Sequence, residues 1–318
     1  MQRRTMGTSG MTVAPLALGG NVFGWTADEA TSFDLIDRFV DAGGNMIDTA
    51  DSYSAWVPGH EGGESERVIG GWLRRSGRRE DVLIASKVGF MEGLAPDVVA
   101  RACDASLDRL GTDRIDLYYM HKDDTDVPLA DSLGAFDALV KAGKVRGIGL
   151  SNFTAERIDE AMRVAEENGL TKPVALQPWY NLVERERYEG DLRDAADRHG
   201  LGVFTYYSIA NGFLAGKYRS KDDLDKSPRG LRNIGYLEGR GPAVLAALDE
   251  VAAQTGARPA TVALAWLAAQ PTVTAPIASA TGETQLSELL ASLTLELSEE
   301  QRARLDAASA WPQRATRR

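Results

Sequence analysis

Six polar or ionisable residues recur along the chain at intervals of 39, 34, 31, 25 and 30 residues. Each ends or directly follows a short apolar run typical of a buried strand, and each run precedes a segment with helical periodicity. In a parallel α/β barrel the carboxyl ends of the strands converge on one face, where the catalytic residues lie. The spacing therefore predicts such a barrel, with these residues at its mouth. The six are Asp48, Lys87, His121, Asn152, Gln177 and Tyr207.

The whole pattern predicts a (β/α)8 TIM barrel that forms a single domain over residues 1–318. A hairpin is expected within residues 3–13, and a long irregular segment, 211–241, with extra helices after the seventh strand. Strands that alternate with helices pair in parallel through right-handed crossovers, so eight such units imply closure. The expected strands are 16–18, 45–47, 82–85, 115–120, 145–150, 174–176, 203–206 and 273–277. The expected helices are 27–41, 64–75, 96–110, 129–140, 155–167, 189–198, 242–254, 259–269, 286–293 and 297–308.

The rival architecture is an open, doubly wound sheet. That fold would place a glycine-rich phosphate turn after its first strand. The segment from Gly19 to Gly24 does not match G-x-G-x-x-G, and no G-x-x-x-x-G-K-[ST] occurs in the chain. The length of 318 residues also suits a barrel of ~250 residues with added loops.

Composition narrows the class of protein. The net charge of −10 argues against a general nucleic-acid surface, because binding phosphates needs an excess of Lys and Arg. The most apolar stretch, 262–269, is too short to cross a membrane, and no secretory segment opens the chain. The single cysteine, Cys103, falls on a helical apolar stripe and is expected to pack there. We therefore expect a cytoplasmic protein with neither nucleic acid nor membrane as partner.

Four residues suggest proton transfer. Tyr53 lies five positions beyond Asp48, and Lys87 and His121 close the next two predicted strands. A lysine at a strand end is partly desolvated and needs a counter-ion, which Asp48 on the neighbouring strand supplies. The ammonium should stabilise the Tyr53 phenolate and lower the phenol pKa from its usual ~10. Tyr53 would then protonate a carbonyl oxygen near neutral pH, with His121 orienting that oxygen.

Other chemistries have weaker support in the sequence. The acidic run 121–126 lacks the spacing and the glycine of an EF-hand, so it is interpreted as a solvated loop, and no metal is expected. No Gly-x-Ser-x-Gly elbow occurs, which argues against serine hydrolysis. A barrel isomerase that moves protons on a sugar without nicotinamide stays open as an alternative.

At these residues the chain resembles the aldo-keto reductase family, over nearly its whole length. Asp48, Tyr53, Lys87 and His121 match that family's catalytic tetrad in order, context and approximate spacing. The resemblance implies reversible NAD(P)H-dependent reduction of an aldehyde or ketone to the alcohol. The hydride would come from the nicotinamide and the proton from Tyr53. The alternative is a cofactor-binding regulatory or redox-sensing subunit with little turnover, since some relatives associate with larger partners.

The resemblance also implies a nicotinamide site along the later strands. Ser151, Asn152 and Gln177 match the residues that hold the nicotinamide carboxamide in the family. Tyr207 matches the aromatic residue that stacks on the ring. Residues 207–217 are similar to the family segment Tyr-Ser-Pro-Leu…Gly-x-Leu-x-Gly-Lys, which wraps the pyrophosphate, although isoleucine replaces the proline here. The contacts implied within this segment are those of Ser208, Ala210, Gly212 and Lys217.

The residues that would meet the adenosine end depart from the family pattern. Thr281 stands where an arginine is expected, and Ser279 stands where other branches have lysine. Ser279, Thr281 and Gln285 can form hydrogen bonds with a phosphate but cannot neutralise it. Glu288 matches an acid that contacts the adenine. The usual cation for the 2′-phosphate of NADP is therefore missing.

NADP(H) is still the expected cofactor, because the family prefers it, and NAD(H) is the alternative. Arg219 or Lys221 in the long segment would then supply the missing charge. The expected partner is a small-molecule carbonyl substrate, and the protein is expected to be a monomer or a homo-oligomer. The sequence names neither the natural carbonyl compound nor the oligomeric state.

Loops at the same mouth should build the substrate pocket. Four aromatic residues lie just beyond strand ends and are candidate walls, and a nearby asparagine adds a polar contact. Aromatic walls suit many carbonyl compounds, from sugar-like ketones to aryl aldehydes, so they do not select one. For each residue the alternative role is packing of its own loop. The five candidates are Asn21, Trp25, Trp56, Phe90 and Trp179.

Overall fold

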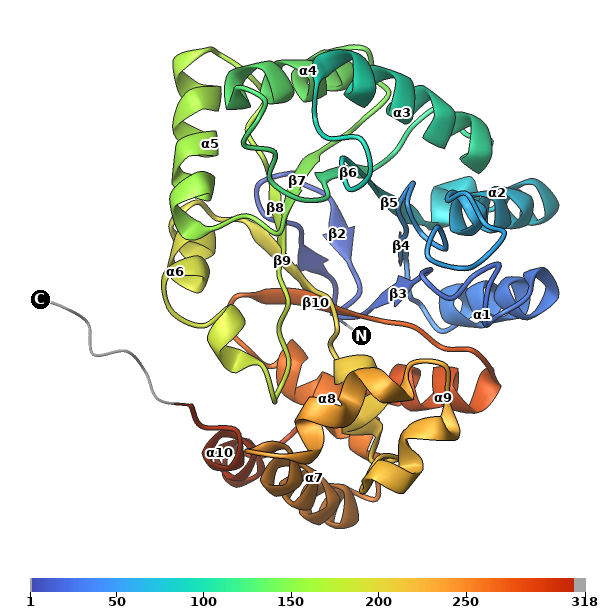
Figure 1. Cartoon of the computed structure of the whole chain (residues 1–318), viewed down its shortest axis with the longest axis vertical. Coiled ribbons are helices and arrows are strands. Elements are labelled where there is room, and N and C mark those ends of the chain that lie inside the picture. Colours follow the sequence, from blue (N-terminus) through green and yellow to red (C-terminus); the bar gives the residue numbers. More distant parts are fainter. Residues whose placement is uncertain (1, 312–318) are drawn as a thin grey trace, which may run out of the picture.

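The computed structural model describes residues 2–311 and contains a closed barrel of parallel strands (Figure 1). Around the barrel the strands follow the order β10-β3-β4-β5-β6-β7-β8-β9, and each pairs with its neighbours in parallel. All their carboxyl ends therefore lie at one face, and the predicted (β/α)8 fold is confirmed. The strands are β3 (Ala17–Gly19), β4 (Met46–Asp48), β5 (Leu83–Val88), β6 (Leu117–Met120), β7 (Ile148–Ser151), β8 (Ala175–Gln177), β9 (Gly202–Thr205) and β10 (Val273–Ala278).

Amphipathic helices surround the barrel, with their apolar faces against it (Figure 1). On α3, for example, Val99, Cys103, Leu107 and Leu110 are buried, so Cys103 packs as expected. None of the helices in residues 2–311 is long and apolar enough to cross a bilayer. The helices are α1 (Glu29–Asp41), α2 (Glu64–Ser76), α3 (Pro96–Leu110), α4 (Leu129–Lys141), α5 (Ala155–Glu167), α6 (Asp191–Arg198), α7 (Gly241–Thr255), α8 (Pro259–Ala268), α9 (Glu283–Ala291) and α10 (Glu299–Ala308).

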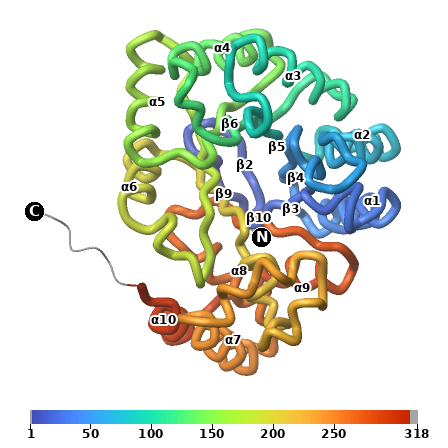
Figure 2. Tube along the Cα trace, viewed as in Figure 1, coloured from blue at the N-terminus to red at the C-terminus, as the bar shows by residue number. Residues whose placement is uncertain are grey.

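The predicted hairpin consists of β1 (Arg4–Thr5) and β2 (Thr12–Val13), which pair in antiparallel fashion. Its residues Met6, Met11 and Val13 share a buried cluster with the side chains inside the barrel. Figure 2 shows this blue amino-terminal segment crossing behind the barrel strands. Because the hairpin also lies against the residue that begins β9, it closes the end of the barrel opposite the candidate site.

The long segment after β9 is more regular than the sequence suggests. It contains the short 3-10 helices η3 (Ala210–Ala215), η4 (Lys221–Lys226) and η5 (Gly230–Leu237). At the start of η4, the Asp223 carboxylate accepts hydrogen bonds from the backbone amides of Arg219 and Ser220. Hydrogen bonds over a few residues stabilise such single turns, and they leave no periodic apolar signal in the sequence.

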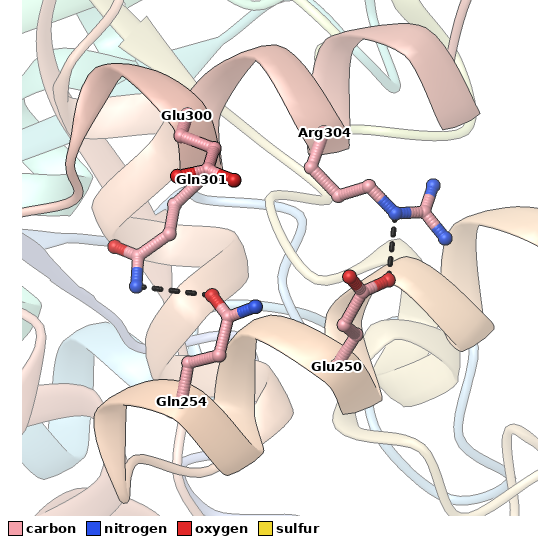
Figure 3. A pocket seen from close by; sticks show the side chains of 5 residues that line it. All are labelled: Glu250, Gln254, Glu300, Gln301 and Arg304. Atoms are coloured by element: carbon pink, nitrogen blue, oxygen red, sulfur yellow. Dashed lines mark hydrogen bonds and ion pairs between the residues drawn. The ribbon is translucent and has the colours of Figure 1, made fainter.

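A surface pocket lies between α7 and α10, away from the barrel mouth (Figure 3). Its polar side chains contact one another across the gap. Arg304 Nε lies 2.7 Å from Glu250 Oε2, and Gln301 Nε2 donates to Gln254 Oε1 at 3.3 Å. These helices lie outside the barrel, so the pocket is separate from the strand ends where the candidate residues gather.

Candidate active site

Lys87 and Asp48 form a buried ion pair at the ends of the neighbouring strands β5 and β4. The Lys87 Nζ lies 2.7 Å from Asp48 Oδ2, 2.7 Å from the Thr49 carbonyl oxygen and 2.8 Å from the Tyr53 hydroxyl. These three acceptors match the three N–H donors of an ammonium group. Burial lowers the pKa of Lys87, and the Asp48 carboxylate opposes that shift. The arrangement therefore suits a charged lysine held entirely away from water.

The Tyr53 hydroxyl has a partner on either side. It accepts from Lys87 and donates to Asp48 Oδ2 at 3.1 Å. Removal from water and then the Asp48 charge raise the pKa of Tyr53 well above its usual range. The prediction of a lowered phenol pKa is therefore wrong, because burial of the hydroxyl and the carboxylate that neutralises Lys87 both favour the neutral phenol. Tyr53 keeps its proton at neutral pH, and Lys87 is already in place to stabilise the oxygen once that proton leaves.

His121 directly follows β6, and its backbone amide donates to the Val88 carbonyl oxygen at 2.8 Å. Burial and then the positive charges of Lys87 and Lys122 lower the pKa of His121 to about 3. The imidazole is therefore neutral at ordinary pH. Its ring centroid lies 6.2 Å from that of Tyr53, so both side chains lie at the same part of the mouth.

The two amide side chains predicted for the nicotinamide carboxamide lie at the ends of β7 and β8. Gln177 Nε2 donates to Asp48 Oδ1 at 2.8 Å, which adds Gln177 to the buried cluster. Asn152 Nδ2 donates to the His121 carbonyl oxygen at 2.7 Å, and Tyr206 donates to Asn152 Oδ1 at 2.7 Å. A ligand amide would have to exchange with these contacts. Tyr206 was not predicted as a site residue, although its position directly after β9 could have indicated that it lies at the mouth.

Ser151 supports this pair of strand ends, since its hydroxyl donates to the Gln177 carbonyl oxygen at 3.0 Å. After β9 the backbone takes unusual conformations. Tyr207, Ala210 and Asn211 have φ values of 54°, 48° and 54°, in the left-handed region that non-glycine residues rarely adopt. Such strained positions gather at functional sites. The Tyr207 ring packs edge-on against Trp179, with centroids 4.7 Å apart.

The segment that resembles a pyrophosphate loop fits an anionic ligand. Gly212 has a φ of 88°, and a Cβ there would lie 3.2 Å from Lys217 Cε, so the backbone and the lysine approach closely. Within residues 2–311, no carboxylate pairs with Lys217, whose Nζ lies 5.1 Å from the Tyr218 ring centroid. The Ser208 hydroxyl donates to the Thr205 carbonyl oxygen at 2.9 Å and so holds the turn. A free cation beside strained backbone is a donor set that suits phosphate.

The residues after β10 interact among themselves. Ser279 Oγ donates to Asn21 Oδ1 at 2.6 Å. This hydrogen bond joins the loop after β10, the last barrel strand, to the loop after β3, the first. The Thr281 amide and hydroxyl both donate to Gln285 Oε1, at 2.9 and 3.1 Å. None of these side chains carries a positive charge, and their predicted contact with the nucleotide stays a prediction.

The cations suggested from the long segment differ in availability. Arg219 makes two bonds of 2.7 Å to the Asp249 carboxylate, so its charge is already neutralised. Lys221 is exposed on η4. Arg258, at the start of α8, was not predicted, and its Nε lies 3.2 Å from Glu288 Oε1. Its charge is therefore paired with the Glu288 carboxylate, as that of Arg219 is paired with Asp249.

Three of the predicted substrate-wall aromatics lie beside the tetrad, whereas Trp179 packs against Tyr206 and Tyr207. Trp25 and Trp56 pack edge-on with centroids 5.8 Å apart, and Trp56 packs against Tyr53 at 6.1 Å. Phe90 lies 5.0 Å from the His121 ring. Exposed fractions of 46% for Trp56 and 51% for Phe90 leave both rings available to a ligand. Apolar surface therefore lines the approach to the phenol.

The acidic run after β6 is less solvated than predicted. Asp123 accepts from Arg157 at 2.7 and 2.8 Å, and Asp124 accepts from the Leu94 amide at 2.8 Å. These carboxylates fix the loop beside the site, because they bind partners on α5 and before α3. Across residues 2–311, no three His, Cys, Asp or Glu side chains gather in a way that could hold a metal ion.

Comparison with known proteins places this site in a family. The sequence profile described as "Aldo/keto reductase family" matches residues 15–310. The chain belongs to the aldo-keto reductase family. Aldo-keto reductases use nicotinamide cofactors, and this protein is an oxidoreductase.

Three similar proteins illustrate how differently the relatives of this chain are named. An "Uncharacterized oxidoreductase YrpG" of Bacillus subtilis is 33% identical over 94% of this chain and 93% of its own length. A "Probable voltage-gated potassium channel subunit beta" of Arabidopsis thaliana is 30% identical over 91% and 90%. An "Aldo-keto reductase yakc [NADP(+)]" of Schizosaccharomyces pombe is 29% identical over 87% and 82%.

Proposed function

We propose that this aldo-keto reductase reversibly reduces an aldehyde or ketone to the alcohol and uses NADP(H) in preference to NAD(H). The observation that carries the proposal is the buried cluster in which Tyr53, Lys87 and Asp48 are joined by hydrogen bonds. A neutral phenol whose oxygen already faces an ammonium is a proton donor suited to a forming alkoxide. The family membership and the relative named for NADP(+) support the cofactor.

The side chains divide the work. Tyr53 gives its proton to the carbonyl oxygen, and Lys87 stabilises the phenolate left behind. Asp48 keeps Lys87 charged, although it also raises the phenol pKa. An alkoxide is a strong base and the Lys87 ammonium stabilises the phenolate, so both favour transfer of the proton from Tyr53 to the alkoxide. The neutral His121 donates a hydrogen bond that orients the carbonyl oxygen.

When bound, the nicotinamide supplies the hydride. Asn152, Gln177 and Ser151 would orient its carboxamide, after exchanging contacts that they make within the protein. Tyr207 would stack on the ring. Asn21, Trp25, Trp56, Phe90 and Trp179 would line the substrate pocket. Further along the nucleotide, the contacts would come from Ser208, Ala210, Gly212, Lys217, Ser279, Thr281, Gln285 and Glu288.

Replacing Tyr53→Phe tests the proposal, because it removes only the phenolic oxygen. We expect kcat/KM for aldehyde reduction to fall by roughly 10²–10⁴-fold, the usual contribution of a general acid. The Kd for NADPH, from fluorescence titration, should change by less than about threefold. Tyr188→Phe is the matched control. The Tyr188 hydroxyl donates to Thr272, which directly precedes β10 at the end of the barrel away from the mouth, so its loss should not affect the rate. Reduction by Tyr53→Phe at the parental rate would refute the assignment.

A second candidate function comes from the relatives named as channel β subunits. A protein of that kind could bind the nucleotide tightly and turn over little, as a sensor of redox state. An assay over a panel of aldehydes and ketones separates the two. Tight NADPH binding without turnover favours the sensor, and saturable reduction of at least one carbonyl compound favours the enzyme.

A further inference from the structure

Arg229 lies between η4 and η5 and reaches across the mouth of the barrel. Its guanidinium carbon lies 5.1 Å from the Trp25 ring centroid, and its Nη2 approaches the Asn21 carbonyl oxygen at 3.5 Å. Asn21 and Trp25 both follow β3, so an arginine from the far part of the chain covers the beginning of the site. The side chain is partly buried in this position.

Local packing fixes the backbone of Arg229. The next residue, Gly230, approaches Leu224 so closely that a Cβ would lie 1.7 Å from the Leu224 carbonyl oxygen. The Arg229 amide donates to Ser227 Oγ at 3.3 Å, and Asn233 Nδ2 donates to the Arg229 carbonyl oxygen at 3.4 Å. A cation on such a held backbone is placed in advance of ligand binding.

Aromatic contacts connect this guanidinium to the reacting centre. Arg229 lies over Trp25, Trp25 packs on Trp56, and Trp56 packs on Tyr53. The positive charge of Arg229 also interacts electrostatically with the Tyr53 phenol and acts to lower its pKa. A carbonyl compound with its oxygen at Tyr53 and its body along the two tryptophans would therefore present its far end to Arg229.

In the part of the chain that the structure describes, Arg229 has no acidic counter-ion, unlike Arg219 and Arg258. Arg219 pairs with Asp249, and Arg258 pairs with Glu288. Within residues 2–311, no carboxylate forms an ion pair with Arg229. Burial and the neighbouring positive charge of Arg232 both lower its pKa. In a chain with a net charge of −10, an unpaired cation over an aromatic ring at the mouth suits an anionic ligand.

We propose that Arg229 binds an anionic group, such as a carboxylate, at the end of the carbonyl substrate opposite the reacting carbonyl. This inference rests on the proposed carbonyl reduction and names a substrate class for it, aldehydes or ketones that carry a negative charge. A phosphate of the nucleotide shares the same chemistry as a ligand, so the experiment must separate the two sources.

Two aldehydes of nearly equal shape provide the test, 4-carboxybenzaldehyde and its neutral methyl ester. Wild type should reduce the carboxylate at least about tenfold more efficiently than the ester, in kcat/KM. Arg229→Gln should lower kcat/KM for the carboxylate by about tenfold to a hundredfold, the loss expected for a charge-assisted hydrogen bond. It should change the ester by less than about threefold. Arg229→Lys should retain part of the preference, because it keeps the charge and loses the planar fork.

Arg219→Gln is the matched control in the same segment, and we expect it to leave the ratio of the two substrates unchanged, because Arg219 is paired with Asp249. Equal efficiency of wild type on both aldehydes overturns the inference. Equal losses on both aldehydes in Arg229→Gln, with a raised Kd for NADPH, also overturn it and assign the guanidinium to the nucleotide.

A binding measurement keeps this test separate from the proposed function. Tryptophan fluorescence is titrated with each aldehyde in the presence of NADP⁺, which cannot reduce them. Tighter binding of the carboxylate in wild type, lost in Arg229→Gln, supports the anion site even if neither compound turns over. Absence of turnover with every carbonyl compound would count against the reductase proposal alone. Equal binding of both aldehydes would count against Arg229.

Discussion

Lys87 and Tyr53 share the carboxylate of Asp48, and this sharing determines how each group holds its protons. The ammonium needs the carboxylate because it is buried. The same carboxylate accepts the Tyr53 hydroxyl and favours the neutral phenol. The site therefore combines a charged ammonium group, Lys87, with a neutral acid, Tyr53. Tyr53 keeps its proton until a more basic alkoxide forms on the substrate.

The neutral state of His121 can be tested by NMR titration. The chain has three histidines, and we expect the His121 ring resonances to stay constant from pH 5 to pH 8, since burial and two lysines lower its pKa to about 3. His60 and His199 provide the comparison within the same sample. A His121 midpoint near 6.5 would contradict the neutral hydrogen-bond donor.

The same pKa shift has a consequence for stability. Below pH 6.5 the unfolded chain takes up a proton at His121, whereas the folded protein takes it up only near pH 3. The free energy of unfolding should therefore fall as pH decreases from 6.5 to 3, by at most about 1.4 kcal/mol per pH unit from this residue. The contribution is fully present above pH 6.5. His121→Gln should lose that part of the dependence in urea unfolding at several pH values.

The gathering of Asp48, Lys87 and Gln177 at the mouth was predictable, because each stands at the end of an apolar run and the barrel brings such ends together. Their mutual contacts were not. The hydrogen bond from Gln177 to Asp48 spans 129 positions. Arg229 lies in a segment without periodicity, so nothing in the sequence indicated that it would cover Trp25. The sign of the Tyr53 pKa shift depended on the burial of its hydroxyl and on its hydrogen bond to Asp48, which only the folded structure shows.

Among the elements, the amino-terminal hairpin lies in close backbone contact with the barrel. Gly202 begins β9, and a Cβ there would lie 2.7 Å from the Gly7 amide nitrogen and 3.2 Å from Met6 Cα. Both contacts involve backbone atoms, so the hairpin would have to move to make room. Arg4 adds a hydrogen bond from β1 to the Val273 carbonyl oxygen at 2.9 Å.

We therefore expect Gly202→Ala to destabilise the fold by about 1–3 kcal/mol, in the range of overpacked cores. Thermal or urea unfolding would measure the change. Gly134→Ala is the control, because Gly134 lies within α4 with nothing near its Cβ position and alanine favours helices. Equal stability of the two variants would contradict this prediction, because it would show that the hairpin can move away from Gly202 without loss of stability.

The boundaries of the elements show what local patterns omit. The runs 115–120 and 145–150 each predicted one strand, but the regular strands are β6 (Leu117–Met120) and β7 (Ile148–Ser151). Ile115 and Val145 form an isolated parallel bridge below them. Apolar residues outside the regular strands are also buried. Hydrophobicity alone therefore predicts where each strand lies in the sequence but not the residues at which it begins and ends.

At the scale of the whole molecule, charge is distributed unevenly. The chain carries a net charge of −10, yet Lys217 and Arg229 lie at the barrel mouth and form no ion pair with an acidic residue among residues 2–311. A net negative charge disfavours the approach of an anionic ligand, so we expect its binding at the mouth to depend on these local cations. The 2′-phosphate of NADP would meet hydroxyl and amide groups at Ser279, Thr281 and Gln285.

Adding a cation at this place should therefore sharpen the choice of nucleotide. Thr281 is exposed at the end of the barrel sequence, and we expect Thr281→Arg to lower the Kd for NADPH about tenfold while the Kd for NADH changes little. Parallel fluorescence titrations with the two nucleotides measure both constants. Thr294→Arg, beyond the other end of α9, adds the same charge as a control. Equal tightening of NADPH and NADH would show that Thr281 does not face the 2′-phosphate, because only that group distinguishes the two nucleotides.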